Sequence, residues 1–532
     1  METLGSFLDS LAERYADREA IAYAPSAEVT ARLTWRELRA ASRLAAKKLL
    51  HAGVGKGTRV GLLCSNRLEW MPIAFGALRL GALLVPFSTL WKRNEIAYAL
   101  RHADVSLLIM LPGFLKHDYL ASLHEIVPEL RGARPGGLYA PHAPALRHVV
   151  LLEGSAAGAL RWSDLPGEAD DGFLDGVEAT VSPVDWATVF FTSGTTAQAK
   201  AVVHCHAALT TSGHRIGDCL GITPEDAWWG HMPLFWSGGF ILGALATMAG
   251  GGRIVLQEQV DARSALTLLE REGCTVMAGW HQAGPLLEHP EFDRRRLRLK
   301  KGSNHPLAPQ LLGPDHLTVG MYGMSETATC VTCARSTDTQ AVRVGTFGRP
   351  LEGMQVTIVD PETRAPVMQG EAGEILVKGP TLMEGYYKVP RATTFDAEGY
   401  FRTGDLGYFD ADGYLHFATR LKEVIKTAGV NVAAAEVEEA LARHPAVKSA
   451  HVVGVAHPTR GENVAAFVVL GPDQGVGAEQ LQAFCRDSLA SYKVPRHIFL
   501  VSEEQVPRTG SGKVEKAALR REAARRVGSD TR

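Results

Sequence analysis

The chain has 532 residues, of which 46% are hydrophobic, and its 56 basic and 58 acidic side chains give a formal net charge of −2 at pH 7. This length exceeds what one hydrophobic core usually supports, so two or more domains are expected. The balanced charge argues against nucleic-acid binding. The seven cysteines are scattered and the N-terminus has no secretory-signal pattern, so we expect a cytoplasmic protein.

Residues 1–150 alternate helix-like stretches with short apolar runs. The runs at 59–64 and 82–86 are typical of parallel strands that are buried on both faces. Residues 232–252 are apolar enough to be mistaken for a membrane span, but they contain a proline and six glycines. A buried helix after a turn is therefore expected there, and no membrane span.

A hydroxyl-rich segment lies at residues 191–200, with the sequence FTSGTTAQAK. The apolar residues 186–191 predict a buried strand before it, and residues 204–220 predict a helix after it. A strand, a polar turn and a helix would bring turn amides, hydroxyl groups and Lys200 together as a cradle for an anion such as a triphosphate. The segment is also compatible with an ordinary polar loop.

Two clusters of residue types that bind metals occur in the chain, and neither predicts a metal site. His204, Cys205 and His206 would lie on adjacent positions of the expected helix, so they cannot all face one ion. Cys330 and Cys333 form a single CxxC pair, and neither a second pair nor a histidine pair follows it, so zinc is not expected.

The pattern changes after residue 347. Short strands interrupted by glycine and proline are expected at 356–359, 373–378 and 413–417, as in a small β-barrel. After residue 422 a further α/β pattern begins. Its predicted elements are a helix at 434–443, strands at 451–455 and 465–470, and a basic C-terminal helix.

Four further motifs follow the hydroxyl-rich segment in order. They are MYGMSET at 321–327, YFRTGDL at 400–406, TRLKEVIK at 419–426 and PRTGSGK at 507–513. The five segments in this order resemble the adenylate-forming superfamily, which contains acyl-CoA synthetases, peptide-synthetase adenylation domains and beetle luciferases. The resemblance extends from Leu33 to Leu519, nearly the whole chain.

This resemblance implies an α/β fold in two parts. A large N-terminal domain, residues 1–421, would contain two α/β subdomains and the small β-barrel. Residues 422–532 would form a small mobile α+β lid, with Lys422 at the hinge between them.

The resemblance also implies a reaction in two steps. A carboxylate would attack the α-phosphorus of ATP and give an acyl-adenylate and pyrophosphate. The thiol of CoA would then attack the acyl carbonyl and release AMP, which is a far better leaving group than oxide. Such chemistry depends on positioning and on neutralising charge, so ATP, Mg²⁺ and CoA are the expected cofactors and co-substrates.

Three residues would be catalytic by this resemblance. Lys200 would hold phosphates, Glu326 would hold Mg²⁺, which prefers carboxylate and phosphate oxygens, and Lys513 would bridge the attacking carboxylate and the α-phosphate. Residues expected to bind the nucleotide are Thr192, Ser193, Gly194, Thr195, Thr196, Tyr322, Gly323, Thr327, Asp405 and Arg420. Alanines 197, 199 and 201 replace the usual Gly, Pro and Gly of the phosphate loop, so a stiffer or differently shaped loop is expected.

The acyl group would lie against segments 233–240, 280–281 and 303–306. Its expected pocket residues are Phe235, Trp236, Gly238, Trp280, His281 and His305. Trp236 replaces a histidine found in many relatives, and its indole favours a mid-sized apolar acid (aryl, alicyclic or medium-chain) over acetate or a very long chain. Plain core packing is an alternative for these tryptophans.

The acceptor is expected to be CoA, which would pass Lys426 and Gly429, where the absence of a side chain leaves room for the pantetheine arm. The alternative is a biosynthetic adenylating enzyme that transfers the acyl group to a carrier protein or an amine. A non-catalytic protein of the same fold is disfavoured because Lys513, Glu326 and Asp405 are all present. A monomer and a homodimer both remain open.

Overall fold

The computed structural model describes residues 1–192, 199–427, 430–457, 460–472, 475–489, 491–509 and 512–530. The chain folds into two compact units that are interleaved in sequence. The first contains Met1–Val356 and Val377–Phe401, and the second contains Thr357–Leu376 and Arg402–Arg532. The boundary predicted between residues 421 and 422 lies inside the second unit and stays a prediction.

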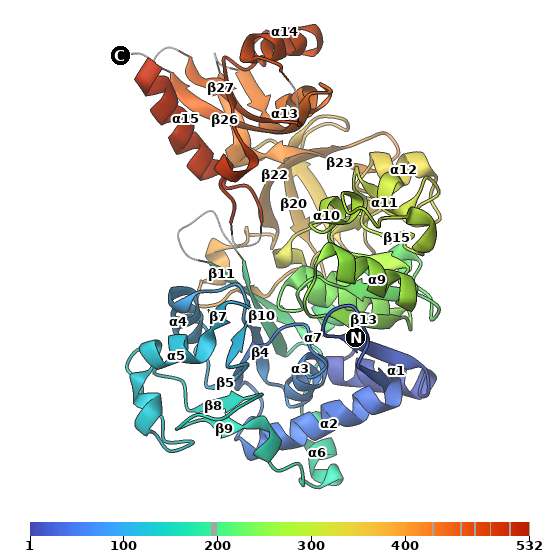
Figure 1. Cartoon of the computed structure of the whole chain (residues 1–532), viewed down its shortest axis with the longest axis vertical. Coiled ribbons are helices and arrows are strands. Elements are labelled where there is room, and N and C mark those ends of the chain that lie inside the picture. Colours follow the sequence, from blue (N-terminus) through green and yellow to red (C-terminus); the bar gives the residue numbers. More distant parts are fainter. Residues whose placement is uncertain are drawn as a thin grey trace. The chain divides into compact units, whose positions relative to one another are not determined.

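An eight-stranded sheet in the first unit has the order β21-β11-β10-β4-β3-β5-β8-β9. Strands β4, β3, β5 and β8 pair in parallel, and every residue of β4 and β5 is buried. Burial on both faces explains why these segments are apolar throughout, and the strands predicted at 59–64 and 82–86 are confirmed. They lie in the blue to cyan part of Figure 1. The bounds are β3 Arg59–Leu63, β4 Leu83–Pro86, β5 Leu107–Met110, β8 His148–Leu151, β9 Leu160–Arg161, β10 Trp186–Thr192, β11 Lys200–Cys205 and β21 Gly385–Tyr386.

A six-stranded sheet in the same unit has the order β15-β14-β12-β13-β1-β2. Its strands pair in parallel except for β1 and β2, which are antiparallel. The bounds are β1 Glu19–Ala24, β2 Ala31–Thr34, β12 Ala227–Gly230, β13 Arg253–Gln257, β14 Val276–Met277 and β15 Lys301–Gly302. The first unit therefore contains the two α/β subdomains that the resemblance implies.

Local signals explain the helices of this unit. Thr34 and Glu37 form a capping box at the start of α2 (Trp35–His51). Gly76 of α3 (Trp70–Arg79) lets the two helices approach, because a Cβ there would lie 2.8 Å from the Ala45 Cβ. The other helices are α1 Leu4–Arg14, α4 Arg93–His102, α5 Tyr119–Ile126, α6 Asp171–Glu178, α7 His206–Leu220, α9 Ala262–Glu272, α10 Ala283–Leu287, α11 Ala308–Leu312 and α12 Gln340–Gly345, and a small hairpin joins β6 Gly113–Phe114 to β7 His117–Asp118.

The buried helix predicted within 232–252 is present as a π-helix, η3 (Gly238–Leu245), that continues into α8 (Ala246–Ala249). Gly243 allows η3 to pack on Trp228, because a Cβ there would lie 2.2 Å from the Trp228 Cζ2. Among the residues that the structure describes, none of the helices has both the length and the apolar character that a membrane crossing requires.

The helix predicted at 204–220 begins two residues later than expected. Residues 200–205 form β11, which pairs antiparallel with β10 from Thr192 opposite Lys200, and α7 starts at His206. The run Ala-Val-Val at 201–203, with its two β-branched residues, favours a strand. The hydroxyl-rich segment therefore joins two antiparallel strands, and no helix N-terminus follows it directly, which corrects the predicted cradle.

Where a small β-barrel is expected, the structure has two sheets of short strands, β16-β17-β18 and β19-β20-β22-β23. Their bounds are β16 Met321–Tyr322, β17 Thr332–Cys333, β18 Arg349–Pro350, β19 Gln355–Val359, β20 Gly373–Lys378, β22 Phe401–Phe409 and β23 Leu415–Arg420.

A five-stranded sheet lies in the second unit, the orange to red part of Figure 1. It contains β24 Val424–Thr427, β25 Val430–Ala433, β26 Val447–His457, β27 Gly461–Leu470 and β28 His497–Leu500. The helices of this unit are α13 Ala434–Ala442, α14 Ala478–Ser488 and α15 Lys516–Asp530. The elements predicted after residue 422 are thus confirmed.

Candidate active site

The β10–β11 hairpin carries the predicted phosphate segment. Thr192 ends β10 and lies opposite Lys200, which begins β11. The predicted residues Ser193, Gly194, Thr195 and Thr196 lie outside the described residues. On the far side of this segment, the Ala199 carbonyl accepts a hydrogen bond from the Tyr98 hydroxyl at 3.1 Å.

Lys200 and Glu326 meet at one aromatic ring. The Lys200 ammonium lies 4.6 Å from the ring centroid of Tyr386, and the Tyr386 hydroxyl donates to Glu326 Oε1 at 2.8 Å. Strand pairing explains the arrangement, because β21 places Tyr386 opposite Val202 of β11. Burial, and then the nearby Glu326 carboxylate, raise the pKa of Tyr386, so its phenol remains a donor.

Sequence reasoning missed Tyr386. The available signal was the pair of adjacent tyrosines that follows a glycine, Gly-Tyr-Tyr at 385–387. Its pairing with β11 could not be read from the sequence, because the two strands are far apart in the chain.

Glu326 lies on a tight turn that the surrounding backbone holds in place. It belongs to a 3₁₀ turn, η5 (Ser325–Thr327), and Ala328 and Thr329 follow with positive φ values of 47° and 77°. Non-glycine residues rarely adopt this conformation, and such strain collects at functional sites. Gly323 is required here, because a Cβ would lie 2.3 Å from the Thr329 carbonyl oxygen.

The predicted residues next to Glu326 are buried. Tyr322 is 6% exposed, and Thr327 is fully buried. The Thr327 hydroxyl caps its own turn, since it accepts the Met324 N–H at 3.0 Å. Their contacts with adenine and phosphate stay predictions.

His204 connects the hairpin to this turn. Its Nε2 lies 2.6 Å from the Ser325 carbonyl oxygen, and burial lowers the pKa of His204 to about 4, so a neutral ring donates this hydrogen bond. Ser325 Oγ also lies 2.8 Å from Ser237 Oγ, which precedes η3. His206 turns elsewhere and accepts the Leu4 N–H through Nδ1. The side chains of His204 and His206 thus have different partners because the first lies on a strand and the second on a helix.

The predicted acyl segment is fixed by one buried amide. Asn66 donates to the carbonyls of Gly230 and Met232 at 2.9 and 3.0 Å, and it accepts the Leu234 N–H at 3.0 Å. The turn that carries Phe235 and Trp236 is therefore rigid. Phe235 is buried and Trp236 is half-buried, with ring centroids 5.5 Å apart. Gly238 lies close to Met232, since a Cβ there would be 3.0 Å from the Met232 sulfur.

The other predicted pocket residues make aromatic contacts. Trp280 stacks on His305, with centroids 4.8 Å apart and planes 9° apart, and its indole N–H donates to the Ser303 carbonyl at 3.0 Å. The ring of His281 lies 5.0 Å from that of His231. Burial, and then His281, lower the pKa of His231 to about 3, so the ring is neutral.

In the second unit, Asp405 and Arg420 face each other across β22 and β23. The Arg420 Nε lies 3.3 Å from Asp405 Oδ1, and the Asp405 side chain is only 5% exposed. The Thr403 hydroxyl accepts the Asp405 N–H at 3.0 Å and donates to the Ile375 carbonyl at 2.7 Å. A buried carboxylate oriented in this way can accept hydroxyl donors.

Lys513 lies in a hairpin near the C-terminus. The Thr509 N–H donates to the Lys513 carbonyl at 2.7 Å, the Glu515 N–H donates to the Pro507 carbonyl at 2.8 Å, and the Lys513 side chain is exposed. Exposure on a turn fits a lysine that is delivered to a substrate.

The remaining predicted residues are Lys422, Lys426 and Gly429, which lie near β24 in the sequence. Lys422 lies in a short turn, η7 (Leu421–Glu423), between β23 and β24, and its side chain is outside the described part of the chain. The Lys426 side chain is 73% exposed on β24. Gly429 lies outside the described residues.

The donor set fits Mg²⁺ held by one carboxylate. Among the described residues, no group of three or more His, Cys, Asp or Glu side chains could hold a metal ion. Mg²⁺ usually takes one or two protein carboxylates together with phosphate oxygens and water, so Glu326 alone is compatible with it.

Comparisons with known proteins agree with this arrangement. Residues 8–387 match the AMP-binding enzyme family, and residues 436–513 match its C-terminal domain. The chain is 32% identical to the acyl-CoA ligase sidI of Aspergillus fumigatus, over 98% of this chain and 91% of that protein. The chain therefore belongs to the AMP-binding enzyme family.

Two solved structures are also similar. The anthranilate CoA ligase AuaEII, in complex with anthranoyl-AMP, is 25% identical with a TM-score of 0.83, over 99% of this chain and 98% of that chain. The amide bond synthetase McbA from Marinactinospora thermotolerans is 26% identical with a TM-score of 0.79, over 97% and 99% of the two chains. The predicted superfamily, fold class and AMP-forming acid–thiol ligase class are confirmed.

Proposed function

We propose that this chain activates a mid-sized apolar carboxylic acid with ATP and transfers the acyl group to CoA, with release of AMP and pyrophosphate. The observation that carries the proposal is the convergence of Lys200 and Glu326 on Tyr386, directly beside the hydroxyl-rich segment. A cation and a carboxylate held on one ring supply both elements that a triphosphate with a divalent ion needs.

The roles of the residues in the first unit follow from their chemistry. Lys200 and the Thr192 hydroxyl bind the triphosphate, and Tyr386 orients both Lys200 and Glu326. Glu326 would hold Mg²⁺, which neutralises phosphate charge when bound. Tyr322 would stack on the adenine, and Gly323 and Thr327 would contact the nucleotide through the turn.

The second unit would contribute three groups to the same reaction. Asp405 accepts the ribose hydroxyls, Arg420 orients that carboxylate, and Lys513 supplies positive charge to the attacking carboxylate and the α-phosphate. The division at residue 422, with Lys422 as a hinge and residues 422–532 as a mobile lid, is part of this proposal.

The acid would lie against an aromatic wall. The rigid turn of Phe235 and Trp236 and the stacked pair of Trp280 and His305 suit a flat or compact apolar acid better than a flexible long chain. Similarity to a ligase of anthranilate supports an aryl acid. Gly238 and His281 complete the proposed wall.

CoA is the proposed acceptor, with Lys426 and Gly429 along its path. Similarity to an amide bond synthetase favours a second candidate, transfer of the acyl group to an amine. We also propose a cytoplasmic location, since all seven cysteines are buried free thiols.

One experiment tests the reaction and names the substrate. The protein is incubated with ATP and a panel of carboxylic acids, with and without CoA, and products are identified by mass spectrometry. A thioester that needs CoA supports the ligase. Adenylate formation that ignores CoA, with amide formed when an amine is added, would replace the ligase by the amide synthetase.

A further inference from the structure

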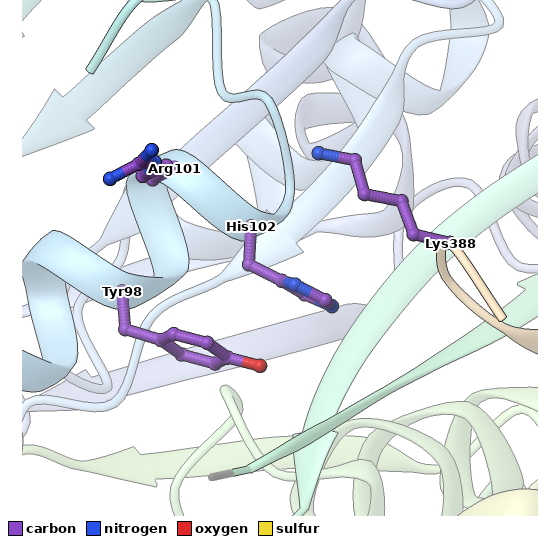
Figure 2. Close-up of a pocket in the computed structure, with 4 residues that line it drawn as sticks. All are labelled: Tyr98, Arg101, His102 and Lys388. Carbon is purple, nitrogen blue, oxygen red and sulfur yellow. The ribbon is translucent and has the colours of Figure 1, made fainter. Parts of the chain in front are cut away.

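A pocket of about 350 Å³ beside the C-terminal end of α4 contains none of the residues assigned above to the proposed reaction. Its lining residues are Tyr98, Arg101, His102 and Lys388. Figure 2 shows that the first three belong to α4, whereas Lys388 reaches towards this helix from another segment. Three of the four side chains carry nitrogen donors, which suits the pocket to an anion.

The two cations of the pocket differ in their surroundings. Arg101 forms no ion pair or hydrogen bond with any residue that the structure describes. Lys388 is held by Asp104, with 2.8 Å between Nζ and Oδ1, and the other Asp104 oxygen accepts the Tyr387 hydroxyl at 3.1 Å. The negative charge of Asp104 is thus offset by Lys388, and the Arg101 guanidinium remains as a planar, permanently charged donor of the kind that recognises phosphate.

The backbone at the rim of the pocket is strained. Lys388 has a φ of 62°, in a turn closed by the Val389 N–H on the Tyr386 carbonyl at 3.0 Å. This position of a turn normally takes glycine. Asp104, its partner, also has a positive φ, of 50°. A lysine at a backbone position that favours glycine indicates a functional role for its ammonium group.

The pocket adjoins the proposed triphosphate segment. The Tyr98 hydroxyl donates to the Ala199 carbonyl, which directly follows the undescribed residues 193–198. The Tyr98 ring stacks on the His102 ring with their centroids 5.0 Å apart. The centroids of these two rings lie 6.1 and 6.2 Å from that of Phe191 in β10. One wall of the pocket is therefore attached to the chain on both sides of that segment.

We propose that this pocket binds a phosphoryl group, with Arg101 as its charged ligand and Lys388 and His102 as further hydrogen-bonding groups. The proposal rests on the proposed function, whose reaction contains two sources of such a group. One is the departing pyrophosphate, and the other is the phosphorylated nucleotide end of CoA. Both carry exposed, negatively charged phosphate oxygens, which complement the positive charge of Arg101.

The test compares Arg101→Gln with Arg93→Gln. Both arginines lie on α4 and both changes remove one charge, but Arg93 pairs with Glu125 away from the pocket. Binding of inorganic pyrophosphate, CoA and 3′-dephospho-CoA to the full chain is measured by calorimetry without acid or turnover. We expect Arg101→Gln to lower the binding affinity for at least one of these ligands by about tenfold or more, and Arg93→Gln to leave all three affinities unchanged.

The ligands separate the two sources. Weaker pyrophosphate binding with unchanged CoA binding identifies the leaving group. Weaker CoA binding, with 3′-dephospho-CoA equally weak in both proteins, identifies the acceptor. Equal binding of all three ligands by the two variants would overturn the proposal.

A second variant tests the other wall. Lys388→Gly removes the ammonium group and relaxes the positive-φ backbone, so a loss of binding cannot come from added strain. We expect Lys388→Gly to lower the binding affinity for the same ligand whose binding Arg101→Gln weakens. The failure of this proposal and the failure of the proposed function can be told apart. If pyrophosphate binding depends on Arg101 but no thioester forms, the pocket proposal holds and the ligase is refuted. If the protein forms thioester but ligand binding is the same in the Arg101→Gln and Arg93→Gln variants, the ligase holds and the pocket proposal is refuted.

Discussion

Tyr386 is the residue on which the first half of the proposed site depends. It receives the Lys200 ammonium on its ring and donates its hydroxyl to Glu326. Sequence motifs identified both charged residues, because each lies in a short recognisable pattern. The tyrosine between them was missed because its role arises from strand pairing between β11 and β21.

We predict that Tyr386→Phe lowers the rate of adenylate formation by roughly ten- to a hundredfold. The ring remains for Lys200, but the Glu326 carboxylate loses a donor, and a hydrogen bond to a charged group contributes about 1.5–3 kcal/mol. Tyr400→Phe is the matched control, since its hydroxyl donates to Gln355 at 3.1 Å. Equal rates for the two variants would remove Tyr386 from the mechanism.

Buried histidines make stability depend on pH. The pKa of His204 is about 4 in the folded protein, below its ordinary value of about 6.5. The unfolded chain therefore binds the proton first as the pH falls, and stability is full above about pH 6.5 and declines towards pH 4. For this group the loss is on the order of 2 kcal/mol by pH 5.

The corresponding experiment follows the melting temperature from pH 7 to pH 5. We expect a smaller decrease in His204→Gln than in the wild type. His142→Gln, a change at an exposed position, should keep the wild-type decrease. A decrease of the same size in all three proteins would show that His204 does not titrate as described.

Elements buried on both faces were the most predictable part of the chain. The continuous apolar runs of β3 and β4 were identified because burial on both faces leaves a clear pattern. The start of α7 was placed two residues early, because histidine and cysteine at 204–205 have no strong preference and the tertiary pairing of β11 decides their state.

The turn that carries Glu326 is predicted to tolerate no side chain at Gly323. In Gly323→Ala the new Cβ would lie 2.3 Å from the Thr329 carbonyl oxygen, so the turn must move. We expect a destabilisation of about 1–3 kcal/mol in chemical unfolding, together with loss of adenylate formation.

Gly176→Ala in α6 is the control for this change. Nothing lies within 4 Å of its Cβ position, so the substitution should be neutral or slightly stabilising. A Gly323→Ala protein as stable and active as this control would show that the turn is not constrained as described.

The whole molecule consists of two compact units, and each holds part of the predicted site. The order of the five motifs along the chain identified the family. Each motif alone is short and only moderately specific, whereas the five together in this order are highly specific. The interleaved boundary of the units, in which residues 357–376 belong with residues 402–532, has no sequence signal, since it arises from pairing within one sheet.

Lys513→Ala tests the division of labour along the chain. We predict that acyl-adenylate formation falls roughly a hundredfold or more, because a positive charge at the transition state is lost. Thioester formation from a supplied acyl-adenylate should continue, since the proposed function uses Lys513 only in the first step. An equal loss in both half-reactions would refute the two-step use of the second unit.

The most direct test of the central claim is acid-dependent exchange of labelled pyrophosphate into ATP in the absence of CoA. If an acyl-adenylate forms, its reversal returns label to ATP, and the exchange should require the acid and be strongly reduced in Lys513→Ala. Formation of acyl-CoA from ATP, acid and CoA without any such exchange would contradict a free-standing adenylation step.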